Sequence, residues 1–301
     1  MVPRTIGIAV NQINLLIITL FASTLATGSL SIFNFAQNLQ GGPLGLFGAS
    51  FSIAVFPVLA ALAAKGENEN FVKTFSVTFR QILFFIIPFS IFILVLRAQI
   101  VRVVLGAGKF DWEDTILTFQ TLGIFALSLF AQGTIPLLAR AFYALHDTKT
   151  PFYIALLTEI VSIGAVLLLI GKFKVIGLAI AFSSAAVFQM LLLLFVLRSR
   201  FDNLDDKNII KFIAKIAFSS MTTGFSIQLT KYLVALLVNL DTFVGIFIQL
   251  VISSFVGISI FVGMCYVVRL EEFFKFKQAL TRKLFKEKQT IVEDTADVSG
   301  I

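Results

Sequence analysis

The chain has 301 residues, of which 58% are hydrophobic and only 14% are charged, and its mean hydropathy is +0.96. A soluble domain needs far more polar surface to cover its core, so this composition excludes soluble proteins and predicts an integral membrane protein. The net charge of +7 does not indicate a nucleic-acid partner, because the basic residues fall in loops and near the C-terminus. One cysteine and one histidine exclude an intrachain disulfide and argue against a zinc or haem site, so we expect no metal and no cofactor.

Apolar runs long enough to cross a membrane recur along the whole chain. A spanning helix needs about 20 mostly apolar residues. Backbone polar groups in lipid must be satisfied within the segment, and the runs are continuous rather than alternating, which favours helices over strands. We therefore predict an all-α integral membrane protein with eight transmembrane helices. The expected spans are about 5–27, 43–64, 76–97, 115–145, 151–171, 174–198, 209–239 and 242–268.

The distribution of Lys and Arg predicts the orientation of these spans. With the N-terminus in the cytoplasm, three quarters of the 24 Lys and Arg residues fall on the cytoplasmic side, as the positive-inside rule requires. We expect a multi-pass protein with both termini cytoplasmic. In the stretch 269–301, phenylalanines and leucines alternate with lysines and arginines up to about residue 288. This stretch is predicted to be a basic amphipathic tail on the inner membrane surface, and a plain stop-transfer charge cluster is the alternative.

Polar side chains inside predicted spans are candidate functional groups, since they are costly in lipid. Glu159 lies about nine residues into the run 151–171, near the middle of the membrane. It would either form a hydrogen bond between helices as a neutral acid or couple transport to a proton or another cation. Gln12 and Asn14, with Asn11, place three amides in one turn of the first span. They would face a wet, substrate-binding cavity or serve in helix packing.

The sequence gives no support for an enzyme, because no nucleophile–base pair, metal-ligand cluster or phosphate-binding loop emerges from it. From the residues alone, the interpretation is a polytopic helical membrane protein, one lobe of a transporter.

A charged hairpin between two apolar runs carries a family resemblance. Residues 138–152 read LARAFYALHDTKTPF and closely resemble the junction between the tenth and eleventh spans of MurJ/MviN-type lipid II flippases. Three further strings agree in order, namely PRTIGIAVNQINLLI at 3–17, PLGLFGASFSIAVFP at 43–57 and VLGAGKFDWEDT at 104–115. The resemblance runs from about residue 3 to residue 200.

The resemblance implies a place in a larger architecture. Members of that family look like fourteen-span bundles with two six-helix lobes and two final helices. Residues 1–200 would form the second lobe, 201–268 the two additional transmembrane helices and 269–301 the cytoplasmic tail. An N-terminal lobe would then be missing from this chain and would be its partner.

The resemblance also implies a function. The family moves the undecaprenyl-pyrophosphate-linked peptidoglycan precursor across the bacterial cytoplasmic (inner) membrane by alternating access, in cell-wall synthesis, and membrane lipids surround it. Coupling to the membrane potential or to a monovalent cation is expected. The alternatives are another exporter of the same superfamily, for polysaccharide-lipids or for drugs and cations, and a non-transporting membrane scaffold.

Specific residues follow from the resemblance. Asn38, in the string AQNL, stands where the family carries an arginine that would meet pyrophosphate, and its amide donates hydrogen bonds without a charge. Glu159 would replace the acid of a sodium site found in some members. Family-motif positions in the hairpin are Arg140, Tyr143, Asp147, Thr150 and Pro151. We expect Asp147 to bond turn amides and Pro151 to occupy the first helical position.

Overall fold

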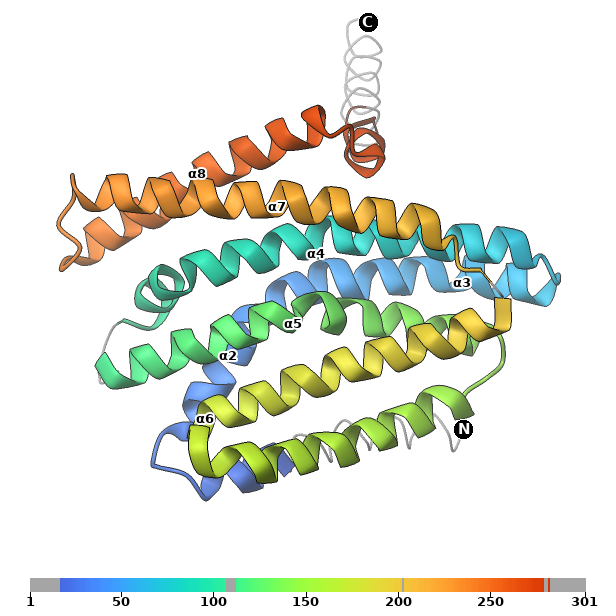
Figure 1. The fold of residues 1–301 in the computed structure, drawn as a ribbon, viewed down its shortest axis with the longest axis horizontal. Helices are drawn as coiled ribbons and strands as arrows, with labels where there is room; N and C mark the ends of the chain where they lie inside the picture. Colours follow the sequence, from blue (N-terminus) through green and yellow to red (C-terminus); the bar gives the residue numbers. More distant parts are fainter. Residues whose placement is uncertain (1–16, 107–111, 202, 279–280, 282–301) are drawn as a thin grey trace, which may run out of the picture.

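The computed structural model describes residues 17–106, 112–201, 203–278 and 281, and its described elements are helices (Figure 1). Residues 17–23 are helical, as are residues 271–278. Between them lie α2 (Ser29–Pro43), the π-helix η1 (Leu44–Ala49), α3 (Ser50–Ala64), α4 (Asn68–Leu105), α5 (Trp112–Ala144), α6 (Lys149–Phe201), α7 (Asp206–Ala235) and α8 (Phe243–Val267).

Within the described ranges, five helices are long and apolar enough to cross a membrane. They are Ser29–Ala64, Asn68–Leu105, Trp112–Ala144, Lys149–Phe201 and Phe243–Val267. The fourth, α6, contains both predicted spans, 151–171 and 174–198. The two are separate helical stretches, because Lys174 between them has non-helical backbone angles (φ 50°, ψ −127°). The ribbon of α6 reverses its direction along its length (Figure 1). The helix α7, predicted as the span 209–239, is not among the five, since polar residues along it, including Lys215, Gln228 and Lys231, lower its hydropathy.

The predicted start of the second span at residue 43 is wrong. The helix begins at Ser29 and continues without a break through η1 and α3 to Ala64. Polar residues in this stretch lower its hydropathy, but Ile32, Phe33 and Ala36 recur at helical spacing and are buried. Packing of this face against α5 decides the helical state. Similarly, α4 begins at Asn68 rather than at 76, with polar turns beyond the apolar run.

The long helix changes direction between α2 and α3 (Figure 1). Pro43 removes a backbone donor at this point, and the π-helix η1 follows it directly. Gly48 lies in η1 against Gly133 of α5, so closely that a Cβ on Gly48 would be 2.8 Å from the Gly133 carbonyl oxygen. The bend and the missing side chain together bring the two backbones into contact.

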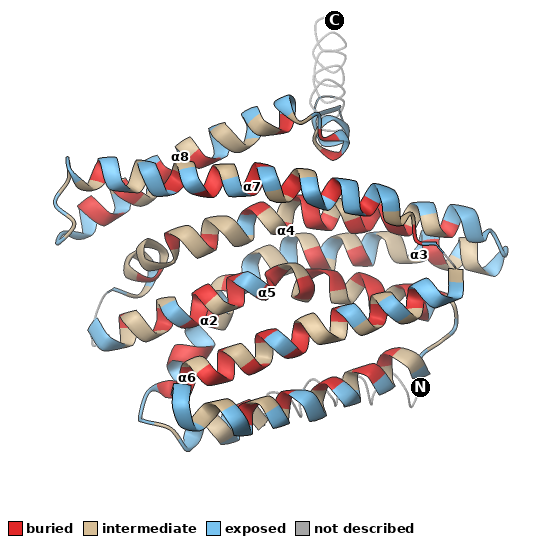
Figure 2. Cartoon of the chain, in the orientation of Figure 1, coloured by how far each residue is buried: buried red, intermediate tan, exposed pale blue. Residues whose placement is uncertain are grey.

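The core is centred on α5, the most buried of the five apolar helices. Phe125 of α5 packs edge-on against Phe33 of α2 and Phe182 of α6, with ring centroids 5.2 and 5.6 Å apart. Buried residues gather on α4 and α5, whereas α6, α7 and α8 present much exposed surface (Figure 2). That outer surface is apolar, with Leu168, Phe225 and Phe255 each more than two thirds exposed. Such a surface suits contact with lipid rather than with water.

Candidate functional site

The family-motif hairpin forms a tight turn between α5 and α6. After Ala144, the amide of His146 donates to the Tyr143 carbonyl at 3.1 Å and the amide of Asp147 donates to the Phe142 carbonyl at 3.0 Å. His146 has a φ of 59°, in the left-handed region. This pattern is a Schellman ending of α5, in which the last helical carbonyls find partners. The turn is therefore built by backbone geometry before any side chain contributes.

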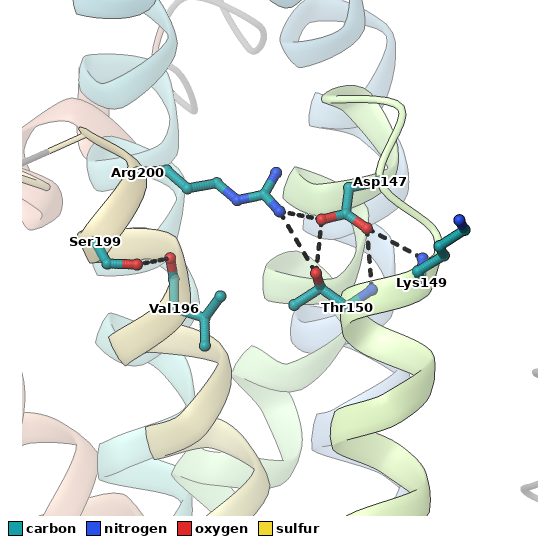
Figure 3. Close-up of polar contacts among 6 residues, drawn as sticks. All are labelled: Asp147, Lys149, Thr150, Val196, Ser199 and Arg200. Carbon is teal, nitrogen blue, oxygen red and sulfur yellow. Dashed lines mark hydrogen bonds and ion pairs between the residues drawn. The ribbon is translucent and has the colours of Figure 1, made fainter.

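Asp147 then caps the start of α6. One carboxylate oxygen accepts from the amides of Lys149 and Thr150 at 3.1 and 2.9 Å, and the other accepts from the Thr150 hydroxyl at 2.7 Å (Figure 3). Arg200, at the far end of α6, forms an ion pair with the same carboxylate and stacks 5.3 Å from the ring centre of Phe142. The expected role of Asp147, bonding turn amides, is thus seen directly.

The charge of Asp147 is stabilised by this arrangement. Partial burial of the carboxyl raises its pKa, but the hydrogen bonds from Thr150 and the neighbouring Arg200 guanidinium outweigh burial and hold the pKa below its usual value. The carboxylate therefore stays ionised at neutral pH.

The other motif residues, Pro151, Tyr143 and Arg140, lie in the helices on either side of the turn. Pro151 is buried and is the third residue of α6, not the first as expected; a proline is tolerated there because first-turn amides lack helical partners. Tyr143 is exposed and Arg140 half-buried, both in the last turns of α5. Neither takes part in the Asp147 hydrogen bonds.

Asn38 lies on the exposed face of α2. The buried face of this helix contains Ile32, Phe33 and Ala36, and the exposed face contains Asn34 and Asn38, one turn apart. We call Ser31, Asn34 and Asn38 the α2 polar stripe. The stripe continues into Gly41, Gly42 and Gly45. A Cβ added at any of these three glycines would have no neighbouring atom within 4 Å. A transmembrane helix that turns amides away from its own bundle requires water or another protein segment beside it.

The remaining predicted site residues are Glu159, Gln12 and Asn14. Glu159 is half-buried in the first half of α6 and does have an interaction partner. Gln12 and Asn14 lie outside the described residues. Within the described ranges, no group of three or more His, Cys, Asp or Glu residues is placed to hold a metal ion.

A buried polar chain links three helices and is only partly visible in the sequence. Gln40 of α2 donates to the Gln132 amide oxygen at 3.1 Å, Gln132 donates to the Ser128 hydroxyl at 2.8 Å, and that hydroxyl donates to Ser183 of α6 at 3.0 Å. The helical spacing of Ser128 and Gln132 is a detectable signal. Their pairing with Gln40 and Ser183 is set by tertiary contacts alone, and it fixes α2 and α6 to α5.

Comparison with known proteins decides the family. A family model described as "Lipid II flippase MurJ" matches residues 1–239. The chain belongs to the lipid II flippase MurJ family. The Haemophilus influenzae protein named "Probable lipid II flippase MurJ" is 34% identical over 199 residues, which is 64% of this chain and 39% of the relative. The Bdellovibrio bacteriovorus protein of the same name is 26% identical over 280 residues, which is 93% of this chain and 53% of the relative.

Solved structures agree with this assignment. A structure titled "Lipid II flippase MurJ, inward closed conformation" superimposes with a TM-score of 0.71 at 27% identity, over 86% of this chain and 51% of that chain. An outward-facing multidrug-resistance MATE transporter of the MOP superfamily gives a TM-score of 0.57 at 17% identity, over 89% of this chain and 64% of that chain, which shows a shared fold. The chain thus spans about half the length of the MurJ proteins it matches. The MurJ proteins that match are themselves named lipid II flippases.

Proposed function

We propose that this chain is the C-terminal half of a lipid II flippase, which moves undecaprenyl-pyrophosphate-linked peptidoglycan precursor from the inner to the outer leaflet of the bacterial cytoplasmic membrane. Residues 1–200 would be the second six-helix lobe, 201–268 the two additional transmembrane helices and 269–301 the cytoplasmic tail. The MurJ family match over residues 1–239 and the half-length coverage of the relatives support the assignment to one half of a flippase. The opposing wall of the transporter would come from an N-terminal lobe.

Eight transmembrane helices with both termini cytoplasmic are part of the proposal. The reversal of α6 at Lys174 supports counting it as two spans. For α7, support comes from its close pairing with the apolar α8, where Gln249 donates to the Lys231 carbonyl at 2.8 Å. The Lys and Arg distribution supports the orientation.

The α2 polar stripe is the observation that carries the function. Its amides point away from the bundle on a helix of membrane-spanning length. Exposing these amides to lipid would cost free energy. A water-filled cavity between two lobes would satisfy them, and Asn38 could donate hydrogen bonds to the pyrophosphate of the substrate there. The bend at Pro43 and η1 would let this wall move when the two lobes alternate access.

Coupling is proposed to act through an ionisable group at membrane depth. Glu159 is the candidate, since a carboxyl there would respond to a monovalent cation or to the membrane potential. A hydrogen-bonding role between helices is the competing explanation, and the two are separated in the Discussion.

Complementation tests the proposal. A strain depleted of its lipid II flippase would receive this chain alone, a MurJ first lobe alone, or both. We expect growth and lipid II translocation only with both, because one lobe has no opposing wall. If no combination restores growth although both chains reach the membrane, the flippase proposal fails. That result would favour the alternative of a non-transporting membrane scaffold.

A further inference from the structure

A polar pocket of about 660 Å³ lies away from the α2 polar stripe, where three segments meet. Its walls come from the first turns of α4, the connection between α6 and α7, and residues 271–278 after α8. The α4 residues that line it lie between 68 and 80, at the boundary between polar turns and the apolar stretch of that helix. In the proposed membrane placement, on which this inference rests, that boundary is the level of the lipid head groups.

The floor of the pocket is held in place by polar contacts, of which the ion pair of Arg80 is the most buried. Arg80 of α4 forms an ion pair with Glu272 at 2.9 Å, with side chains only 12% and 6% exposed. Asp205 accepts a hydrogen bond from the Ser76 hydroxyl at 2.8 Å and another from the Asn208 amide at 2.6 Å. The buried Nε of Arg80 has no hydrogen-bond partner among the described residues. The Arg80–Glu272 pair thus places a guanidinium in the floor, beside the exposed charges of the rim.

The rim carries two opposite pairs of charges. Glu69 and Lys73 lie one turn apart on α4, and Glu271 and Lys275 lie one turn apart on the segment after α8. All four are exposed and line the pocket. The ion pairs in the described part of the chain involve other residues, so these two ammonium groups and two carboxylates have not neutralised each other.

This charge pattern selects the ligand. An anion alone would be attracted by the lysines and repelled by Glu69 and Glu271, and a simple cation would meet the reverse. A ligand with a phosphate and a primary ammonium a few ångströms apart satisfies both sets, because the ammonium offers three donors to carboxylates. Val72, Val77 and Phe201 line the same pocket and would cover the apolar start of attached chains.

We propose that this pocket binds the head group of a zwitterionic phospholipid of the phosphatidylethanolamine class. The phosphate contacts Lys73 and Lys275, with the Arg80 guanidinium adding positive charge beneath it, and the ammonium contacts Glu69 and Glu271. A lipid bound in this way bridges α4 of the lobe and the segment that follows α8. The free head group phosphoethanolamine shares the same charges, and the test separates it from the lipid.

The test is direct binding to the purified chain in a neutral detergent, followed by native mass spectrometry and by thermal unfolding. Short-chain phosphatidylethanolamine, phosphatidylcholine and phosphatidylglycerol are compared as ligands. We expect phosphatidylethanolamine to bind about tenfold more tightly than the other two, and to raise the unfolding temperature most. Equal binding of the three lipids would overturn the proposal.

Variants locate the site. The double variant Lys73→Ala with Lys275→Ala should weaken phosphatidylethanolamine binding about tenfold, whereas Lys207→Ala with Lys211→Ala, which removes two exposed lysines of α7 outside the pocket, should not. Glu69→Gln with Glu271→Gln should abolish the preference over phosphatidylglycerol while binding of lipid phosphate persists. Unchanged affinity in the lysine variant, or an unchanged preference in the glutamate variant, would refute the assignment.

A competition experiment with soluble phosphoethanolamine completes the test. Phosphoethanolamine should compete only at far higher concentration than the lipid, because it lacks the apolar contacts; equal potency would identify a soluble ligand and overturn the lipid proposal. Since binding is measured without transport, its failure leaves the complementation result standing, and a failed complementation leaves the binding result interpretable.

Discussion

Arg200 pairs with Asp147, fifty-three positions before it in the chain, and thereby fastens the end of α6 to the turn that begins α6 (Figure 3). The same carboxylate caps the first turn of that helix through the amides of Lys149 and Thr150. The two contacts differ in strength, because a helix cap satisfies backbone donors that have no other partner, whereas the arginine is more than one third exposed and screened by solvent.

Replacing Asp147 with Ala should therefore cost more than removing its ion-pair partner. We expect Asp147→Ala to lower the free energy of unfolding by about 1–2 kcal/mol, from loss of the cap, and Arg200→Ala to lower it by about 0–1 kcal/mol. Thermal unfolding in detergent measures both. Equal losses would mean that the ion pair, rather than the cap, holds the turn.

The stability contributed by Asp147 should depend on pH in a defined direction. Because its pKa is lower in the folded chain than in the unfolded chain, the contribution is complete above the unfolded value of about 3.9 and is lost as the pH falls through the folded value. The difference in unfolding temperature between the wild type and Asp147→Asn should be constant from pH 7 to pH 5 and shrink towards pH 3. A difference that grows on acidification would contradict this sign.

The contact between Gly48 and Gly133 should not tolerate a methyl group. Gly48→Ala places Cβ 2.8 Å from a carbonyl oxygen of the packed α5 backbone, so the free energy of unfolding should fall by about 1–3 kcal/mol. Gly45→Ala, in the same π-helix, meets open space and serves as the matched control, with no loss expected. Similar losses of unfolding free energy in the two variants would show that the substitutions disturb the π-helix conformation itself rather than the close approach of Gly48 to Gly133.

Restoring a charge on the α2 polar stripe should strengthen binding of a pyrophosphate lipid. We expect Asn38→Arg to raise affinity for an undecaprenyl-pyrophosphate ligand about tenfold or more, as one charge-assisted hydrogen bond is gained. Tyr153→Arg adds the same charge to an exposed position of α6 and should have little effect. Unchanged affinity in Asn38→Arg would remove the stripe from the substrate path.

A coupling role of Glu159 would appear only in the assembled two-lobe transporter. Glu159→Gln should lower lipid II translocation and remove its dependence on pH or on the coupling cation, because the amide cannot change charge. Glu113→Gln, at the exposed start of α5, is the control for loss of a carboxylate. A variant with normal rate and normal pH profile would assign Glu159 to helix packing.

The sequence alone determined the class of protein and much of its layout. Hydrophobicity is additive along the chain, so long apolar runs such as those in α5 and α8 could be located within a few residues. The hairpin string around Asp147 identified the family and the capping role, because both depend on residues close together in sequence.

Tertiary structure decided what depends on contacts between distant residues. The helix from Ser29 to Pro43 was missed because its polar residues mask its helical periodicity, and only burial of Phe33 and Ala36 against α5 makes it helical. The partners of Gln132 and Arg200, and the meeting of Lys73 with Lys275 at one pocket, join segments that no local pattern connects. Composition identifies a membrane protein, but which polar groups meet is set by how its helices pack.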